Sequence, residues 1–268
     1  MKLTAIIAVR NESLFIGRCC AYLESQGIDF AIIDNESTDD TRAIAESFRG
    51  RGLTCIVNHP YPGFYDWISI LKHKEQLARE LDSDWFMHLD ADEIPQSPQR
   101  DEPLLTRLGA VDAEGYTAVN FDEFVFVPAS PDARHEGDDY VKNMYRYFFF
   151  EPHQNRLIRA WRRTMDIELM SSGGHGASFS TRRIYPQNFV LRHYIALSME
   201  HLVLKYKMQR AYAPAEVAMG WHGWRPRFAE ELVRMPPLEE LHDIRTDSDW
   251  NRSHPRDHHL FLKSPLCQ

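Results

Sequence analysis

The sequence lacks the features that mark several common classes of protein. Its 4 cysteines include no Cys-x-x-Cys pair, which argues against the usual zinc and dithiol redox motifs. They are Cys19, Cys20, Cys55 and Cys267. The formal net charge of −8 disfavours nonspecific binding to nucleic acid, so we expect no nucleic-acid partner. No run reaches the roughly 18–20 apolar residues that a membrane-spanning helix needs, so we expect no transmembrane segment.

The N-terminus also lacks the pattern of a secretory signal. Residues 1–9 are too short to hold an apolar signal region followed by a cleavage site, and they have the pattern of a strand. We therefore expect a cytoplasmic protein, and this expectation leaves room for peripheral contact with a membrane.

What the sequence does contain is typical of a globular α/β protein. The 268 residues suffice for one large α/β domain or two small ones. The hydrophobic fraction of 43% and the charged fraction of 26% are ordinary for such a protein, so a sizeable core is expected.

The first ~90 residues alternate apolar runs with helical patterns. The expected strands are 3–9, 30–33, 53–57 and 85–89, and the expected helices are 13–26, a segment that ends near residue 48, and 66–81. Regular alternation of this kind predicts a parallel sheet with right-handed crossovers. Ligands then gather beyond the carboxyl ends of the strands, here at Asn11, Asp34 and Asp90.

The pattern changes after Pro95, which we expect to prevent regular structure nearby. The β-rich segments 116–127, 145–150, 155–161 and 189–194 predict antiparallel or mixed strands, and 198–211 has the pattern of an amphipathic helix.

The most informative stretch is the end of the expected strand 85–89, where the apolar run gives way to Asp90, Asp92 and Glu93. Alternate residues of an extended backbone point to the same side, so Asp90 and Asp92 can face one site. Two close carboxylates repel each other unless a cation lies between them. Hard oxygen ligands suit Mg²⁺ or Mn²⁺, which commonly bridge phosphate oxygens. The alternative for this pattern is a solvated acidic turn.

Three segments in this order resemble the motifs of family 2-like glycosyltransferases of the GT-A fold. The segments are Ala8-Val9-Arg10-Asn11-Glu12, Ile33-Asp34-Asn35-Glu36-Ser37-Thr38-Asp39-Asp40-Thr41 and Leu89-Asp90-Ala91-Asp92-Glu93. Asn35 stands where the family pattern has a second Asp. In the C-terminal half, a further set of residues is similar to the family 92-like branch: His193, Tyr194, Ser198, Glu200 and Lys205.

The resemblance implies a GT-A α/β fold, with a mostly parallel central sheet, helices on both faces and a mixed β/α C-terminal half. It also implies a division of roles along the chain. Residues 1–95 are expected to bind the nucleotide sugar, residues 96–212 to form the acceptor and catalytic half of the same domain, and residues 213–268 to form an arm or lid.

The resemblance further implies particular site residues. A Mn²⁺ or Mg²⁺ ion is expected on Asp90, Asp92 and a histidine from the C-terminal half, for which we favour His193 over His175. The residues expected to bind the nucleotide sugar are Asn11, Glu12, Asp34, Asn35, Lys72, Lys74, Asp90 and His175. For either lysine taken alone, a solvated helix face is the alternative.

An inverting transferase needs a general base, and Glu123 or Asp122 is best placed for this role by its order in the chain. The two neighbours point to opposite faces of a strand, so only one can serve, and we favour Glu123. Asp166 and Glu168 are further alternatives.

We therefore expect a metal-dependent glycosyltransferase that moves a sugar from a nucleotide-diphosphate donor to a hydroxyl of a glycan or glycoconjugate. The resemblance implies inversion, and the missing Gln-x-x-Arg-Trp motif implies non-processive transfer. A catalytically inactive nucleotide-sugar-binding or scaffold protein is the alternative. A nucleotidyltransferase would need a Gly-rich basic loop after the first strand. The sequence there is Arg10-Asn11-Glu12-Ser13, which is not such a loop. The oligomeric state is open.

Overall fold

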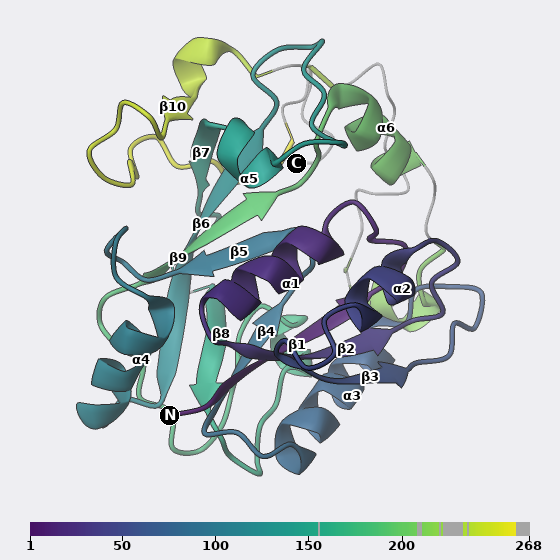
Figure 1. Cartoon of the computed structure of the whole chain (residues 1–268), viewed down its shortest axis with the longest axis vertical. Coiled ribbons are helices and arrows are strands. Elements are labelled where there is room, and N and C mark those ends of the chain that lie inside the picture. Colours follow the sequence, from purple (N-terminus) through teal and green to yellow (C-terminus); the bar gives the residue numbers. More distant parts are fainter. Residues whose placement is uncertain (155, 208–210, 220, 222–232, 235, 261–268) are drawn as a thin grey trace. The chain divides into compact units, whose positions relative to one another are not determined.

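The computed structural model describes residues 1–154, 156–207, 211–219, 221, 233–234 and 236–260 (Figure 1). The chain divides into two compact units. Unit 1 comprises Met1–Pro62, Asp66–Asp122 and Asn155–Leu191, and unit 2 comprises Gly63–Tyr65, Glu123–Gln154 and Arg192–Gln268. The predicted division of roles among residues 1–95, 96–212 and 213–268 stays a prediction.

Unit 1 contains parallel strands in the order β3, β2, β1, β4, as the alternating pattern predicts. These strands are β1 (Leu3–Val9), β2 (Asp29–Asp34), β3 (Leu53–Asn58) and β4 (Trp85–Leu89). The antiparallel strand β8 (Leu157–Arg162) continues the sheet next to β4, and the first half of β6 (Ala118–Val127) pairs with β8. The prediction of antiparallel or mixed strands in the second half of the sequence is therefore confirmed.

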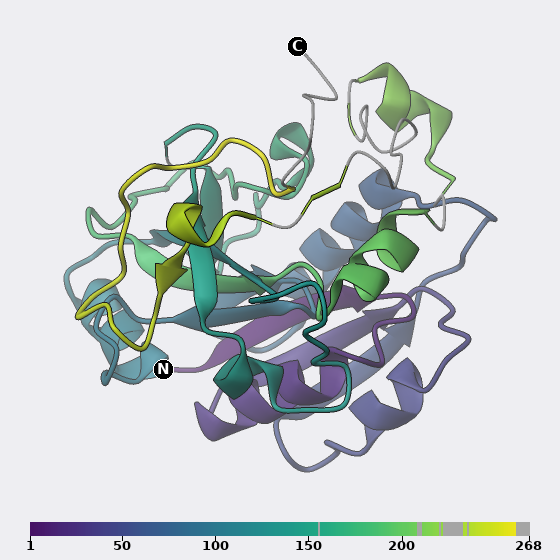
Figure 2. The same ribbon diagram turned by 90° about the horizontal axis from the view of Figure 1, so that it is seen from above.

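The helices of unit 1 cover both faces of its parallel strands. Figure 2 shows α1 (Ile16–Ser25) and α2 (Thr41–Glu46) on one face and α3 (Trp67–Glu80) on the other. Right-handed crossovers require this, because the chain steps one way across the sheet from β1 to β3 and then returns past β1 to β4. The connection from β1 to β2 and the connection from β3 to β4 therefore run in opposite directions across the sheet. Ligands of open α/β sheets bind at such a switch point, here beyond the carboxyl ends of β1 and β4.

Helix α3 carries both core residues and a buried cation toward the sheet. Its N-cap residue, Asp66, accepts a 3.0 Å hydrogen bond from the backbone N–H of Ser69, which satisfies one of the free donors at the helix start. Leu71 packs in the cluster that includes Phe86 of β4. Lys74 lies on the same buried side of the helix. The packing of α3 therefore brings an ammonium group beneath the end of β4.

The expectation that Pro95 prevents regular structure is wrong. Glu93–Gln96 forms the short strand β5, which contains Pro95 and pairs with β9 (Phe189–Tyr194). Proline lacks a backbone N–H, and a strand tolerates it where that donor is not needed for a second ladder. Because β5 lies off the main path of the sheet, it meets this condition. The helix α4 (Leu104–Ala113) follows it.

Unit 2 is built on antiparallel pairing. The second half of β6 pairs with β7 (Arg146–Phe150), and β10 (His242–Asp243) pairs with β7. Its helices are α5 (Tyr140–Asn143), α6 (Met199–Lys207) and α7 (Pro214–Ala218). The predicted helix 198–211 corresponds to α6, and residues 208–210 of that prediction lie outside the described residues. A cluster that includes Val125, Phe148, Ile195 and Leu202 forms the core of this unit.

No helix in the described part of the chain is both long enough and apolar enough to cross a membrane. The described residues also include short 3₁₀ turns at Met170–Ser172 (η1) and Leu238–Glu240 (η4).

Candidate active site

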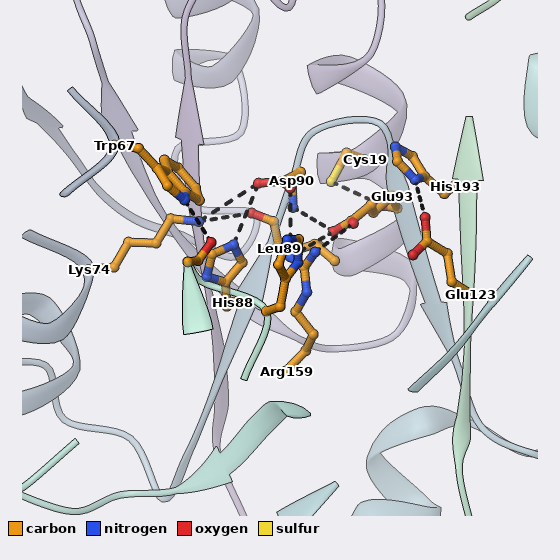
Figure 3. A network of polar contacts seen from close by, with 12 residues as sticks. Cys19, Trp67, Lys74, His88, Leu89, Asp90, Glu93, Glu123, Arg159 and His193 are labelled. Atoms are coloured by element: carbon orange, nitrogen blue, oxygen red, sulfur yellow. Dashed lines mark hydrogen bonds and ion pairs between the residues drawn. The ribbon is translucent and has the colours of Figure 1, made fainter. Parts of the chain in front are cut away.

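Asp90 lies at the carboxyl end of β4 with three nitrogen-bearing side chains around its carboxylate (Figure 3). Its Oδ1 is 4.0 Å from Nζ of Lys74 and 3.7 Å from Nε2 of His88, and its Oδ2 is 3.6 Å from Nη1 of Arg159. These separations are longer than hydrogen bonds, and the side chain of Asp90 is 39% exposed. The carboxylate is thus held by charge while part of its surface stays open to a ligand.

These neighbours keep Asp90 ionised. Burial favours the neutral acid, but the polar contact with His88 and the charges of Arg159 and Lys74 outweigh it and hold the pKa of Asp90 well below its usual value. Burial lowers the pKa of His88 well below its usual value, and the positive charge of Lys74 adds to this effect. His88 is therefore neutral near pH 7, and the charges that balance Asp90 come from Lys74 and Arg159.

Of the two lysines predicted to face the nucleotide, the structure brings only Lys74 to this cluster. Lys74 is fully buried and donates a 3.3 Å hydrogen bond to the backbone carbonyl of Leu89, whereas Lys72 is exposed. Burial lowers the pKa of Lys74 to about 8, and the neighbouring Asp90 carboxylate opposes that effect. Lys72 corresponds to the solvated helix face that was its alternative.

The third acid of the sequence motif, Glu93, has a structural partner. Its two carboxylate oxygens lie 3.1 and 3.3 Å from Nη2 and Nη1 of Arg159, and both side chains are buried. The same carboxylate accepts a 2.9 Å hydrogen bond from the backbone N–H of Asp90. Glu93 and Arg159 therefore fix the turn that carries Asp90 and Asp92.

A glycine packs directly against the ring that faces Asp90. Gly174 has a φ of +84°, and a Cβ atom there would lie 2.9 to 3.0 Å from atoms of Leu71, His88 and Trp67. Trp67 meets the His88 ring edge-on at 5.8 Å and donates a 2.8 Å hydrogen bond to the carbonyl of Gly173. Only a residue without a side chain fits at position 174, so the loop and the His88 ring confine each other.

Asp90 and Asp92 have the chemistry that a divalent cation needs, and their joint ligation of one ion stays a prediction. Both supply hard carboxylate oxygens, and the ionised state of Asp90 is secured by Lys74 and Arg159. Mg²⁺ and Mn²⁺ are commonly held by one or two carboxylates, with substrate phosphates and water completing the shell. Among the described residues, the one group of three potential metal ligands is Glu123, His193 and His259. An ion at Asp90 and Asp92 would therefore need a nucleotide diphosphate to supply its remaining ligands.

Asn11 and Glu12, the predicted nucleotide-binding residues after β1, join their loop to the segment that follows β2. Asn11 adopts a left-handed φ of 57°, and its Oδ1 accepts a 2.8 Å hydrogen bond from the backbone N–H of Thr38. The backbone N–H of Glu12 donates a 2.7 Å hydrogen bond to Oγ1 of Thr41. In the described structure, Asn11 and Glu12 therefore shape the edge of the switch point, and a contact with nucleotide stays a prediction.

Asp34 and Asn35 are both buried at the end of β2. Asp34 accepts a hydrogen bond from the backbone N–H of Ser37 and pairs with Arg42 at 3.3 Å. The side-chain amide of Asn35 donates to the carbonyls of His59 and Pro60, at 3.0 and 3.1 Å. Its Oδ1 is buried and has no hydrogen-bond partner within the described structure. An unsatisfied buried acceptor is costly, so this oxygen can accept a hydrogen bond from a ligand, and the predicted contact of Asn35 with nucleotide stays a prediction.

Glu123 and two histidines meet in unit 2. Its Oε1 lies 2.6 Å from Nδ1 of His193, as Figure 3 shows, and 2.7 Å from Nε2 of His259. Burial favours the neutral acid, but His259 and His193 outweigh it and hold the pKa of Glu123 well below its usual value. His193 thus contacts the predicted base, and its predicted ligation together with Asp90 and Asp92 stays a prediction.

The other predicted residues have separate partners. Asp122, in unit 1, is buried and accepts a 2.8 Å hydrogen bond from the side-chain amide of Asn188. His175 is exposed, with its Nδ1 3.2 Å from Nη1 of Arg156. The alternative bases Asp166 and Glu168 accept hydrogen bonds from the backbone N–H groups of Ser180 and Ser171, at 2.8 and 2.7 Å.

Sequence reasoning missed Arg159 and His259. Arg159 stands in the β-rich segment 155–161, and a charged residue inside a buried strand is a signal that it has a buried partner. His259 stands in a tail with little periodicity, and nothing local indicates that it approaches a residue 136 positions earlier.

Comparisons with known proteins show similarity to glycosyltransferases. A family model described as Glycosyl transferase family 2 matches residues 4–159. Uncharacterized glycosyltransferases of Rickettsia conorii and Rickettsia felis are 30% and 31% identical over 101 residues. This is 38% of the chain and about a third (32%) of the length of these relatives. The crystal structure of S. aureus TarS is similar with a TM-score of 0.46 and 12% identity, over 78% of this chain and 40% of that chain. The family match includes Asp90, Asp92 and Arg159.

Proposed function

The chain belongs to glycosyl transferase family 2, and on this basis we propose that it moves a sugar from a nucleotide-diphosphate donor to a hydroxyl group of a glycan or glycoconjugate. Membership also confirms the predicted fold class, an α/β fold of the GT-A type. The observation that carries the proposal is the environment of Asp90. An ionised, partly exposed carboxylate follows β4 at the switch point, where ligands of such sheets bind.

The diphosphate of the donor is proposed to bind at Asp90 and Asp92 through a divalent cation. A bound Mn²⁺ or Mg²⁺ would act as a Lewis acid that stabilises the charge developing on the departing diphosphate. The chain itself supplies the conditions for this arrangement. Arg159 and Lys74 hold the charge of Asp90, and Glu93 fixes the turn through its hydrogen bond from the N–H of Asp90.

The nucleoside is proposed to lie beyond the ends of β1 and β2. The loops there are joined by Asn11 and Glu12, and Asp34 is held by Arg42. Asn35 offers the acceptor Oδ1, since its amide N–H groups are both used by backbone carbonyls. This geometry favours a base that presents an N–H donor at its edge.

The general base for an inverting, non-processive transfer is proposed to be Asp122. Glu123 is a weaker base, because two imidazoles contact one of its oxygens and lower its pKa. The side-chain amide of Asn188 donates a hydrogen bond to Asp122 and helps to orient its carboxylate. Asp122 would take the proton of the acceptor hydroxyl as that oxygen bonds to the anomeric carbon. The bond from that carbon to the diphosphate oxygen breaks, and the diphosphate leaves with the electron pair.

Thermal stability measured against a panel of nucleoside diphosphates, with and without Mn²⁺, tests the donor site. A ligand that binds only the native state raises the melting temperature by mass action. We expect a rise with one diphosphate that needs Mn²⁺ and disappears in Asp92→Asn. The matched control is Asp82→Asn, because the side chain of Asp82 is 98% exposed. No rise with any diphosphate would overturn the donor site.

Turnover distinguishes an enzyme from an inactive binding protein. We expect Asp122→Asn to keep the Mn²⁺-dependent rise in melting temperature but to lose 10²-fold or more of the transfer rate, on the order of what a general base contributes. A wild-type chain that binds the diphosphate but never consumes a nucleotide sugar would support the inactive alternative.

A further inference from the structure

We propose that Glu123, His193 and His259 form a second cation site, in unit 2, that takes a transition metal such as Zn²⁺. Its ligands differ in kind from the two carboxylates of the proposed donor site. The proposal does not depend on glycosyl transfer.

Three distant parts of the chain converge at this point. Glu123 belongs to β6, His193 lies 70 positions later in β9, and His259 lies 136 positions later. The potential ligand atoms, one from each residue, all lie within 4.8 Å of one another. The two imidazole rings have centroids 5.2 Å apart and planes at 88°, so they approach the carboxylate from different directions. The three donors are therefore close enough together to share a single ion.

The kind of ligand selects the kind of metal. Zn²⁺ sites with an open fourth position have three protein ligands. Two imidazole nitrogens and one carboxylate oxygen are one such set. Imidazole suits Zn²⁺, Cu²⁺, Fe²⁺ and Ni²⁺, whereas sites made of carboxylate, carbonyl and water suit Mg²⁺ and Mn²⁺. The Glu123 cluster therefore differs from Asp90 and Asp92 in the cation that it should prefer.

The burial of the three groups fits a site that an ion can enter. Glu123 is buried on its strand, whereas the side chains of His193 and His259 are 16% and 27% exposed. Both imidazole side chains therefore reach the solvent, from which an ion and a water molecule can approach the site.

The surrounding strand holds one of the ligands in place. Phe150 of β7 stands directly opposite Glu123 in the antiparallel pair. Its ring packs on the imidazole of His259, with centroids 3.9 Å apart. The element that pairs with the carboxylate thus also positions an imidazole, which reduces the reorganisation needed to bind an ion.

Without a cation, both imidazoles can donate hydrogen bonds to the same oxygen, and the distances of 2.6 and 2.7 Å suit such bonds. Two ligands at Zn²⁺ bond lengths in tetrahedral geometry are ~3.3 Å apart. Metal binding therefore requires the donors to separate by less than about 1 Å, a shift that ring rotation can provide. A purely hydrogen-bonded cluster is the competing outcome.

The test uses the full chain, freed of metal with a chelator and then titrated with Zn²⁺ or Co²⁺ alone. We expect one equivalent to bind, the visible absorption of four-coordinate Co²⁺ to appear, and Zn²⁺ to raise the melting temperature. His259→Ala and Glu123→Gln should weaken Zn²⁺ binding by 10²-fold or more and abolish the Co²⁺ absorption. His258→Ala is the matched control, because its side chain is 58% exposed, and it should bind like the wild type.

Further variants keep the result interpretable. His259→Asn retains a donor toward Glu123 but supplies a poor transition-metal ligand, so it should fold and still lose Zn²⁺. Asp92→Asn should keep Zn²⁺ binding while losing the Mn²⁺-dependent nucleotide response, which separates failure of this proposal from failure of the donor site. Absence of stoichiometric Zn²⁺ or Co²⁺ uptake, or uptake that His259→Asn leaves unchanged, would show a hydrogen-bonded cluster and overturn the proposal.

Discussion

Asp90 in unit 1 and Glu123 in unit 2 are two carboxylates whose pKa values are both held well below the usual range, but by different means. The charges that balance Asp90 come from Lys74 and Arg159. The pKa of Glu123 is lowered by two imidazoles, a kind of side chain that can also ligate a metal. The two regions therefore prepare a carboxylate for different tasks.

The difference shows what each environment allows. The ammonium group of Lys74 and the guanidinium group of Arg159 do not ligate a metal, and together with His88 they hold the carboxylate of Asp90 charged and in place for a ligand from outside. The Glu123 cluster contains two imidazoles and a carboxylate, which are side chains that can themselves ligate a transition metal. Under the two proposals, the donor site needs its substrate to complete the ligands of its ion, whereas the unit 2 site supplies three ligands and needs only water besides them.

Removing Arg159 should break the first region most severely. Arg159→Met leaves the buried carboxylate of Glu93 without its charge partner, and we expect a loss of about 3–5 kcal/mol in the free energy of unfolding. Urea denaturation measures this loss. Arg162→Met, on the same strand but exposed, should cost no more than about 1 kcal/mol. Equal losses for the two variants would mean that the buried pair is not the support of this turn.

Gly174→Ala should have the next largest effect. An added Cβ would combine the strain of a left-handed φ, about 1–2 kcal/mol, with overpacking against His88 and Trp67, about 1–3 kcal/mol. Gly63→Ala separates these two contributions, since Gly63 has a φ of +89° and nothing within 4 Å of the added atom. We expect thermal unfolding to show a clearly larger loss for Gly174→Ala. If both substitutions cost the same, the close packing on His88 is not important.

His259→Ala should have the smallest effect on the metal-free chain. The lost hydrogen bond to Glu123 should cost about 1–2 kcal/mol, because the site is partly exposed and His193 continues to contact the carboxylate. Comparison with His258→Ala, which should change stability by less than about 0.5 kcal/mol, isolates this contribution. A cost as large as that of Arg159→Met would show that the two carboxylates are supported alike.

The parallel half of the fold was predictable because its signals are local. The strands Leu3–Val9 and Trp85–Leu89 occupy the predicted residues, since each is a continuous apolar run between polar breaks. Asn11 and Asp90 accordingly follow the ends of these strands, and the predicted binding of ligands there stays a prediction. Pro95 misled the prediction, because the effect of proline depends on whether a neighbouring strand needs its N–H, and pairing is not a local property.

The choice between Lys72 and Lys74 needed knowledge of which face of α3 packs on the sheet. Residues two apart on a helix point in different directions, and the apolar residue Leu71 lies on the same side as Lys74. The apolar stripe could have selected Lys74 in advance. Contacts such as that of Glu123 with His259 arise from long-range folding, and no residue near either one signals the other.

Release of nucleoside diphosphate from a panel of nucleotide sugars tests the central claim most directly. The wild-type chain should consume one donor in the presence of Mn²⁺, Asp82→Asn should match it, and Asp92→Asn should be slower by 10²-fold or more, in the range expected for lost stabilisation of developing charge. If the Asp92→Asn variant turned over the donor as fast as the wild type, the assignment of the donor site to Asp90 and Asp92 would be contradicted.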